Sequence, residues 1–224
     1  MIEKLSYNID ENTPMYGGKK GFIIERTSSI EKGDSANTSF WSLPNHLGTH
    51  IDLPHHFHID GKKIDDFHSD FWFFNGNKIQ LLDVKLPKKE LLIKPEHIDT
   101  NDLKFDAELL LLKTGFHKYR DKEEYWKNNP GVSIEFVKWL KQNFKNLRVI
   151  GMDFISLSSW QHRDAGREVH KILLDPKKSI LPIEDMNLSK IGVDTVFNKV
   201  IVAPLMVNKS DGTPCTVFAE VEKK

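Results

Sequence analysis

Uninterrupted runs of apolar residues are the feature that most constrains how this chain can fold. Leu109–Leu112 is apolar at every position. A strand with one face in water alternates apolar and polar residues, whereas a strand covered on both faces does not need to alternate. Such runs therefore predict strands buried between two layers. The apolar, β-rich segments expected to form strands are Gly21–Thr27, Lys78–Val84, Glu108–Thr114, Leu147–Asp153, Lys199–Val207 and Cys215–Val221.

Two helices are predicted between these strands. The clearest runs from Ile134 to Phe144, because Pro130-Gly131 breaks the chain before it, Ser133 can cap it, and its apolar residues share one face. A second helix is expected over Asp164–Leu174. Strands outnumber helices, and we find no internal repeat or flexible linker. The sequence therefore predicts one α/β domain spanning residues 1–224, with a mixed sheet.

Composition excludes several classes of protein. Lys+Arg and Asp+Glu both number 32, so the net charge is zero and nucleic acid is not an expected partner. The apolar runs are shorter than the ~20 residues that cross a bilayer, and the polar N-terminus does not resemble a secretory signal. The single cysteine, Cys215, is predicted to be a core residue and excludes an internal disulfide. We expect a cytoplasmic protein with no membrane partner, whose lysine-rich segments 17–21 and 85–94 are ordinary surface turns.

Histidine is concentrated in one segment. The chain has ten histidines, and five of them fall within thirteen residues around Asp52: His46, His50, His55, His56 and His58. Neutral imidazole and carboxylate are the usual protein ligands of zinc and other divalent first-row metals. The segment therefore predicts a metal site, since five histidines with an acid among them are not typical of a solvated loop.

The spacing within this segment restricts its conformation. In a helix Asp52 would turn away from His46 and His50, and Pro54 would oppose continuation. In an extended strand all three side chains project to one side. A straight strand would separate the Cα atoms of His46 and His50 by ~13 Å, which is nearly too far for one ion. The chain must therefore bend between them, and Gly48 is the residue that allows it.

The stretch His46–Phe57 resembles the H-x-G-T-H-x-D-x-P-x-H-F motif of the cyclase family, which includes bacterial kynurenine formamidases and isatin hydrolases. Weaker elements resemble other parts of the family in the same order: Leu5-Ser6, Thr13–Tyr16, Lys113–Gly115, Ile150–Asp153 with Ser156, His170–Leu174 and Ile183-Glu184. The resemblance spans most of the chain. It implies a swivelling β/β/α domain that assembles into homodimers or larger homo-oligomers.

The same resemblance implies roles for individual residues. It assigns metal binding to His46, His50, Asp52, His170 and Glu184, with Asp52 in the position that bridges toward a second metal. The cofactor would be zinc or manganese, as one or two ions per chain. His56 matches the family's acid/base histidine, whereas its neighbour His55 matches no family position and is expected to be solvent-exposed or to lie behind the site.

The closing element departs from the kynurenine formamidase pattern. Its gap from His170 to Glu184 is longer, with Pro176–Lys178 as the insertion. An insertion can slide the strand by one residue, and adjacent strand residues face opposite sides, so only Glu184 or Asp185 should point inward. We expect Glu184 to point into the site, with Asp185 solvent-exposed or capping the turn before Asn187.

Candidate substrate contacts are fewer. Tyr16 or the aromatic cluster Phe71–Phe74 could stack on an aromatic substrate, although a core or subunit-interface role is the main alternative for the cluster. His162 offers either another ligand or substrate contact, or a surface histidine before a helix.

The expected function is metal-dependent hydrolysis of a small amide, either an aryl formamide such as N-formylkynurenine or a cyclic amide such as isatin. A bound metal makes water a stronger acid, so that hydroxide attacks the carbonyl while His56 passes a proton to the leaving nitrogen. The alternatives are a cyclase or dehydratase acting on a non-amide substrate, and a non-catalytic metal-dependent binding protein. His56 favours an enzyme, because binding alone needs no additional proton-transfer group.

Overall fold

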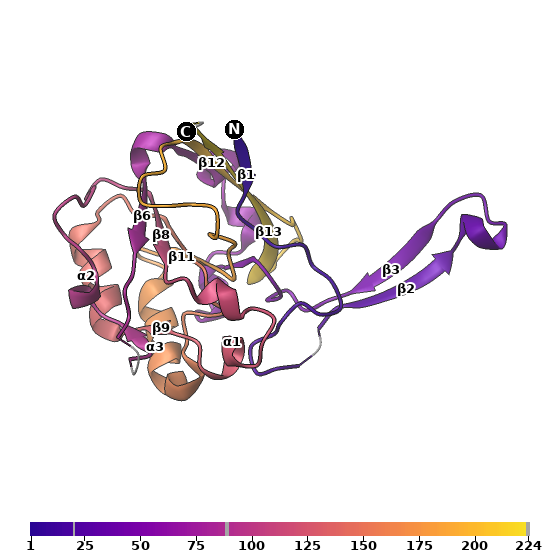
Figure 1. The fold of residues 1–224 in the computed structure, drawn as a ribbon, viewed down its shortest axis with the longest axis horizontal. Coiled ribbons are helices and arrows are strands. Elements are labelled where there is room, and N and C mark those ends of the chain that lie inside the picture. The colour runs from indigo at the N-terminus through magenta and orange to yellow at the C-terminus, as the bar shows by residue number, and fades with distance from the viewer. Residues whose placement is uncertain (20, 88–89, 223–224) are drawn as a thin grey trace.

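The computed structural model describes residues 1–19, 21–87 and 90–222 (Figure 1). Residue 20 and residues 88–89, which fall in the two predicted lysine-rich turns, lie outside the described residues. The strands are β1 (Ile2–Lys4), β2 (Ile23–Ser28), β3 (Thr38–Ser42), β4 (His50–Asp52), β5 (Phe73–Asn75), β6 (Ile79–Asp83), β7 (Leu92–Ile93), β8 (Leu109–Lys113), β9 (Gly131–Val132), β10 (Val149–Met152), β11 (Leu181–Glu184), β12 (Phe197–Pro204) and β13 (Gly212–Val221). The α-helices are α1 (Glu124–Lys127), α2 (Ile134–Asn143) and α3 (Arg163–Leu173).

One mixed sheet forms the centre of the molecule. Within the described residues it has nine strands, in the order β5-β12-β13-β4-β11-β10-β8-β6, with β1 paired to β13. The strands β6, β8, β10 and β11 run parallel to one another. Every other pairing in the sheet is antiparallel. The short strand β4 therefore lies where the parallel half meets the antiparallel half.

Strand β8 shows why its sequence is continuously apolar. Leu109 and Leu111 pack into a core cluster that also takes side chains from β11, β12 and β13. Leu110 and Leu112 point to the other side, into a second cluster beneath α2 and α3. Both faces of β8 are thus buried, as the sequence predicts. Because the first cluster takes residues from both halves of the sheet, the sheet curls around it.

The two predicted helices are confirmed, each within one residue of its expected ends. The hydroxyl of Ser133 caps α2 by accepting a hydrogen bond from the Phe136 N–H at 3.1 Å. Helix α2 buries Phe136, Val137 and Leu140 and packs beside α3. Among the described residues, no helix combines the length and apolar character needed to cross a bilayer.

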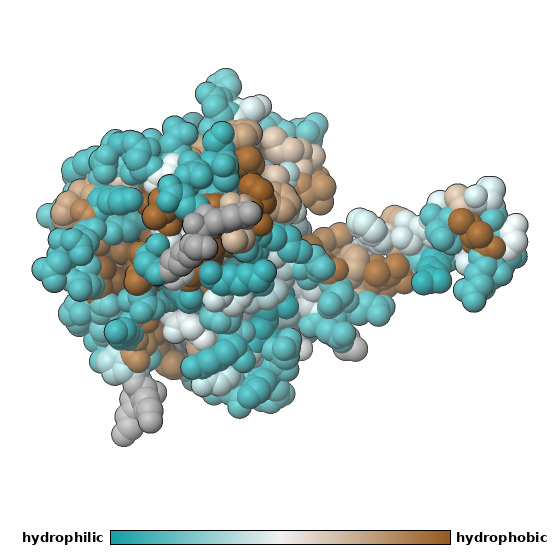
Figure 2. Space-filling view, turned by 45° about the horizontal axis from the view of Figure 1, so that its top comes forward, coloured by the Kyte–Doolittle hydropathy of each residue, from teal (hydrophilic) through white to brown (hydrophobic). Residues whose placement is uncertain are grey.

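Strands β2 and β3 form a hairpin that extends away from the rest of the molecule (Figure 1). We call residues 23–42 the arm. The predicted strand at 21–27 is present as β2, but unlike β8 its residues are not covered by a second layer. Phe40 and Trp41 on β3 are 60% and 63% exposed. Figure 2 shows apolar side chains gathered along the arm.

Candidate active site

The register of β4 with its neighbours brings distant residues to one place. His50 lies opposite Glu184 in the β4–β11 pairing, and Asp52 lies opposite Gly212 in the β4–β13 pairing. His46 precedes β4 in the chain, His56 ends the 3-10 turn that follows it, and His170 comes from α3. The structure thus gathers all six residues that the sequence singles out for metal binding and proton transfer.

The chain bends before β4, as the histidine spacing requires. Gly48 has φ +64°, in the left-handed region that glycine adopts without strain. Its carbonyl accepts a hydrogen bond from His50 Nδ1 at 2.8 Å. The bend therefore brings His46 toward Asp52 and also fixes the ring of His50.

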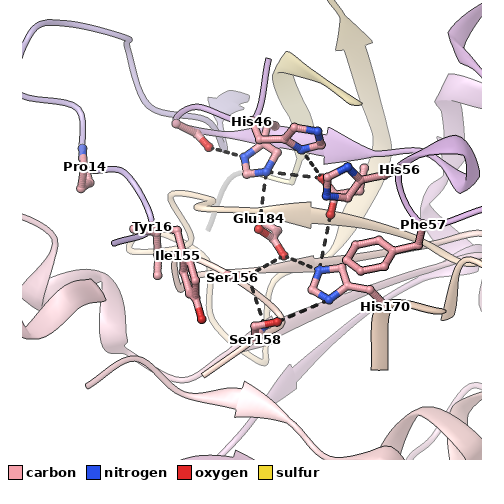
Figure 3. Close-up of a pocket in the computed structure, with 13 residues that line it drawn as sticks. Pro14, Tyr16, His46, His56, Phe57, Ile155, Ser156, Ser158, His170 and Glu184 are labelled. Carbon is pink, nitrogen blue, oxygen red and sulfur yellow. Dashed lines mark hydrogen bonds and ion pairs between the residues drawn. The ribbon is translucent and has the colours of Figure 1, made fainter. Parts of the chain in front are cut away.

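Two carboxylates and two imidazoles form the buried part of the site (Figure 3). His50 Nε2 lies 3.4 Å from both Asp52 Oδ1 and Glu184 Oε2. His170 Nε2 lies 3.5 Å from both Asp52 Oδ2 and Glu184 Oε1. Two ligands bound tetrahedrally to one ion at ~2.0–2.1 Å are separated by ~3.3 Å. The observed spacing suits a divalent metal.

The outward nitrogens of the two buried rings support this interpretation. His50 Nδ1 is bonded to the Gly48 carbonyl, and His170 Nδ1 is 2.8 Å from the Gly166 carbonyl. A carbonyl only accepts, so each Nδ1 carries a proton, and Nε2 is the ring nitrogen that can offer a lone pair to a metal. Both Nε2 atoms face the carboxylates. This donor set, with its outer hydrogen bonds, is what a bound cation requires.

Electrostatics also favour a positive charge here. Burial opposes protonation of His50, but the hydrogen bond and charge of Asp52, with the charge of Glu184, raise its pKa to about 9. For His170 burial is again outweighed by Asp52 and Glu184, which raise its pKa to about 10. The histidines in turn overcome burial and hold the pKa of Asp52 well below its usual range. A cation is therefore stabilised between the two carboxylates.

A second pair of histidines lies nearer the surface. His46 Nδ1 is 2.7 Å from Asp52 Oδ1, and the rings of His46 and His56 are 4.1 Å apart. Asp211 Oδ2 lies 3.1 Å from His46 Nε2 and 2.8 Å from His56 Nδ1. Partial burial opposes ionisation of Asp211, but both histidines lower its pKa below the ordinary value.

Asp211 is a site residue that sequence reasoning missed. It lies just before β13, far along the chain from the histidine segment, and reaches the site because Gly212 pairs with Asp52. The only sequence signal is the Asp211-Gly212 pair before an apolar strand, which ordinarily indicates a turn.

A cavity of about 270 Å³ is lined in part by these six converging residues. Pro14, Tyr16 and Ile155 lie on one side in Figure 3, and His56 and Phe57 lie on the other. The phenol oxygen of Tyr16 is buried and has no hydrogen-bond partner among the described residues. Burial is also the main reason that its pKa rises to about 12. The Tyr16 hydroxyl therefore stays neutral and is available to a ligand.

Other candidate contacts lie elsewhere. His162 is exposed at the start of α3 and does not line the cavity, which agrees with its reading as a surface histidine. Trp72 and Phe74 are buried in the core, so most of the aromatic cluster has the structural role. Pro176–Lys178 form the turn between α3 and β11.

The expectation for Asp185 is wrong. Its side chain is 1% exposed and accepts hydrogen bonds from Arg120 Nε at 2.9 Å and Nη2 at 2.7 Å, and from the Tyr125 hydroxyl. The alternation of faces does separate Glu184 from Asp185. The side opposite Glu184, however, is covered by Arg120 and Tyr125, so Asp185 is buried and not exposed to solvent.

Comparison with known proteins fits this arrangement. A family model described as putative cyclase matches residues 4–159. The chain belongs to the cyclase family. This confirms the family indicated by the histidine motif.

Individual relatives match nearly the whole chain. A kynurenine formamidase of Bacillus cereus is 27% identical over 94% of this chain and 92% of its own length. Cyclase-like protein 3 of Arabidopsis thaliana is 25% identical over 95% of this chain and 77% of its own length. Among solved structures, isatin hydrolase A from Labrenzia aggregata superposes with a TM-score of 0.77 at 20% identity, covering 98% of this chain and 93% of that one. The fold is therefore that of the cyclase family.

Proposed function

We propose that this chain is a metal-dependent hydrolase of a small amide, such as an aryl formamide of the N-formylkynurenine kind or a cyclic amide of the isatin kind. The observation that carries the proposal is the convergence of His50, His170, Asp52 and Glu184, with both Nε2 atoms facing the two carboxylates, next to His56 and a small cavity. Relatives named kynurenine formamidase and a structural neighbour named isatin hydrolase support the choice of substrate class.

The residues divide into two sets that share Asp52. His46 Nδ1 and His50 Nε2 face Asp52 Oδ1, while His170 Nε2 faces Asp52 Oδ2. Glu184 lies close to both His50 and His170. These residues would hold one or two divalent ions, zinc or manganese. When bound, such an ion acts as a Lewis acid toward a carbonyl group and makes water more acidic at neutral pH.

His56 performs the proton transfer. Its Nδ1 is held by Asp211, which leaves Nε2 as the ring nitrogen available to the cavity that His56 lines. In hydrolysis of a formamide, water adds to the carbonyl carbon, the C–N bond breaks, and the nitrogen takes up a proton. His56 first accepts a proton from water and then donates it to that nitrogen, giving the free amine and formic acid, which releases its proton to solvent as formate.

The cavity walls select the substrate. Pro14, Phe57 and Ile155 give an apolar lining that excludes water from a small ring, while the Tyr16 hydroxyl supplies a donor inside it. Ser156 and Ser158 add polar groups near Glu184 and His170. A cavity of about 270 Å³ restricts the ligand to a small molecule.

The test pairs metal analysis with a hydrolysis screen. The purified protein is assayed for zinc and manganese, stripped with a chelator, reloaded, and offered formanilide, N-formylkynurenine, isatin and a lactone. We expect turnover of at least one amide, abolished by chelation and restored by the metal. His162→Ala serves as a control variant. It replaces an exposed histidine outside the cavity and should have the activity of wild type.

Three results would overturn the proposal. Full amide hydrolysis after exhaustive chelation would show that the metal is not needed. Turnover of the lactone alone would favour the cyclase or dehydratase alternative, and metal binding without turnover of any substrate would favour the binding protein.

We also propose that the chain works as a homo-oligomer through its arm. An isolated two-stranded hairpin is marginally stable in water, and this one exposes Ile23, Ile24, Ile30, Phe40 and Trp41. A second copy of the chain would cover these side chains. Light scattering should show a dimer or larger assembly, converted to monomer by Phe40→Ser with Trp41→Ser. Ile59→Ser, at an exposed isoleucine off the arm, is the control. A monomeric wild-type protein would contradict this.

A further inference from the structure

The three histidines assigned to metal binding differ in what holds their outer nitrogens. His50 and His170 each donate to a main-chain carbonyl. His46 instead has Asp211 Oδ2 3.1 Å from its Nε2, while its Nδ1 faces Asp52. A carboxylate accepting from the outer nitrogen fixes the tautomer and makes the inner nitrogen a stronger metal donor. His46 is thus the member of this trio whose outer nitrogen is held by a carboxylate and not by a main-chain carbonyl.

The same oxygen of Asp211 also serves His56. Asp211 Oδ2 lies 2.8 Å from His56 Nδ1, so one carboxylate oxygen joins a metal-binding ring to the proton-transfer ring. The two rings lie 4.1 Å apart and 32° from parallel. Each ring donates a hydrogen bond to Asp211 from one nitrogen. The other nitrogen is left for metal binding in His46 and for proton transfer in His56.

Asp211 is itself held in place. Its second oxygen, Oδ1, accepts a hydrogen bond from Asn45 Nδ2 at 2.7 Å. Its carbonyl accepts one from the Leu53 N–H at 2.9 Å, which ties the residue to the end of β4. A carboxylate fixed at both its side chain and its backbone has little freedom to move. Asp211 therefore sets the positions of the two rings.

The next residue, Gly212, packs closely against the ring of His46. A Cβ atom added to Gly212 would lie 2.2 Å from Cε1 of His46. Only glycine therefore lets the His46 ring lie against the start of β13. Asp211 and Gly212 together determine the position of His46: Asp211 accepts a hydrogen bond from its Nε2, and Gly212 leaves room for its ring.

We propose that Asp211 is a positioning residue shared by both functions of the site: it orients His46 toward the metal and holds His56 with Nε2 toward the substrate. The His56 half rests on the proposed hydrolase function, whereas the His46 half concerns metal binding alone. Asp211 does not touch the substrate, and its effect passes through the two rings.

The test uses Asp211→Asn, which keeps the size of the side chain and removes its charge. Asp65→Asn is the matched control, because this exposed carboxylate accepts from the Lys209 N–H two residues before Asp211 and contacts neither ring. Zinc titrated into the chelated proteins should bind Asp211→Asn about 10–100-fold more weakly than wild type, the usual effect of losing such an outer partner. Asp65→Asn should bind zinc as wild type does.

A double-mutant cycle tests the second half. At saturating metal, Asp211→Asn should lower kcat about 10–100-fold with a smaller change in KM. In the His56→Ala background the same substitution should lower kcat little further, because two residues that act as a unit are not additive. An undiminished loss in that background would overturn the link to His56.

The two proposals can fail separately. Normal zinc affinity in Asp211→Asn would overturn the role of Asp211 toward His46, whatever the activity. A wild-type protein that binds zinc but hydrolyses none of the amides would overturn the proposed function, and the zinc titration would still decide the first half.

Discussion

The inner and outer histidines of the site are held by different means. His50 and His170 are buried, and main-chain carbonyls fix both rings. The side chains of His46 and His56 are 23% and 31% exposed, and the side chain of Asp211 orients both. The inner pair is thus positioned by the backbone itself. The outer pair depends on a register between β4 and β13 and on one carboxylate.

This difference leads to different expected effects of substitutions at the two pairs of histidines. Backbone carbonyls cannot be removed by substitution, so the inner pair keeps its geometry as long as the fold is intact. The outer pair faces the cavity, where a proton must move. The side chain of Asp211 aligns this pair, and a substitution can remove it. We therefore expect inner substitutions to abolish metal binding, whereas outer ones should at most weaken it and should lower turnover.

The largest effects should follow His50→Ala and His170→Ala. Each removes a proposed metal ligand and one of the two buried histidines that pair with Asp52 and Glu184. Metal content should fall sharply and activity should be lost. The metal-free variants should also be less stable than the metal-free wild type by about 3–5 kcal/mol. Elemental analysis and urea denaturation measure both, and His50→Ala with full metal occupancy would contradict the assignment.

Glu184→Gln and Asp185→Asn test two adjacent acids, of which only Glu184 faces the inner histidines. Glu184→Gln should lower metal stoichiometry and turnover because it removes an inner carboxylate. Asp185→Asn should keep the metal but lower the free energy of unfolding by about 1–3 kcal/mol, since it weakens the charged hydrogen bonds to Arg120. The reverse outcome, with metal lost only in Asp185→Asn, would show that the strand presents the other acid.

A smaller effect concerns pH. In the chelated protein the pKa of His50 is raised from 6.5 to about 9, so protonated His50 stabilises the fold fully below pH 6.5. That contribution is lost as pH rises through about 9. The melting temperature of chelated wild type should exceed that of His50→Gln most at low pH, and the gap should narrow toward alkaline pH. A gap that widens there would contradict the cause assigned to the shift.

The sequence predicts the parts of this molecule that local patterns control. Continuous apolar residues in Leu109–Leu112 indicate a strand covered on both faces, and Ser133 marks the start of α2. The even spacing of His46, His50 and Asp52, with Gly48 between them, predicts a bent, extended metal-binding segment. Each of these follows from backbone geometry over a few residues.

What the sequence could not show depends on tertiary contacts. Asp211 enters the site through strand pairing with a segment remote in the chain, and no local pattern marks it. Asp185 was expected in solvent because alternation places it opposite Glu184, but Arg120 and Tyr125 cover that face. The exposure of β2 likewise depends on where the arm leaves the body, which its apolar sequence does not reveal.

The most direct test of the division between inner and outer histidines is the metal content of His56→Ala beside His50→Ala. His56 lies close enough to His46 and Asp52 to be a ligand itself. We predict that His56→Ala retains at least one zinc or manganese per chain while kcat falls about 10²–10⁴-fold, the range for loss of a general acid/base. His50→Ala should lose the metal. Equal loss of metal from both variants would make His56 a ligand and contradict the account.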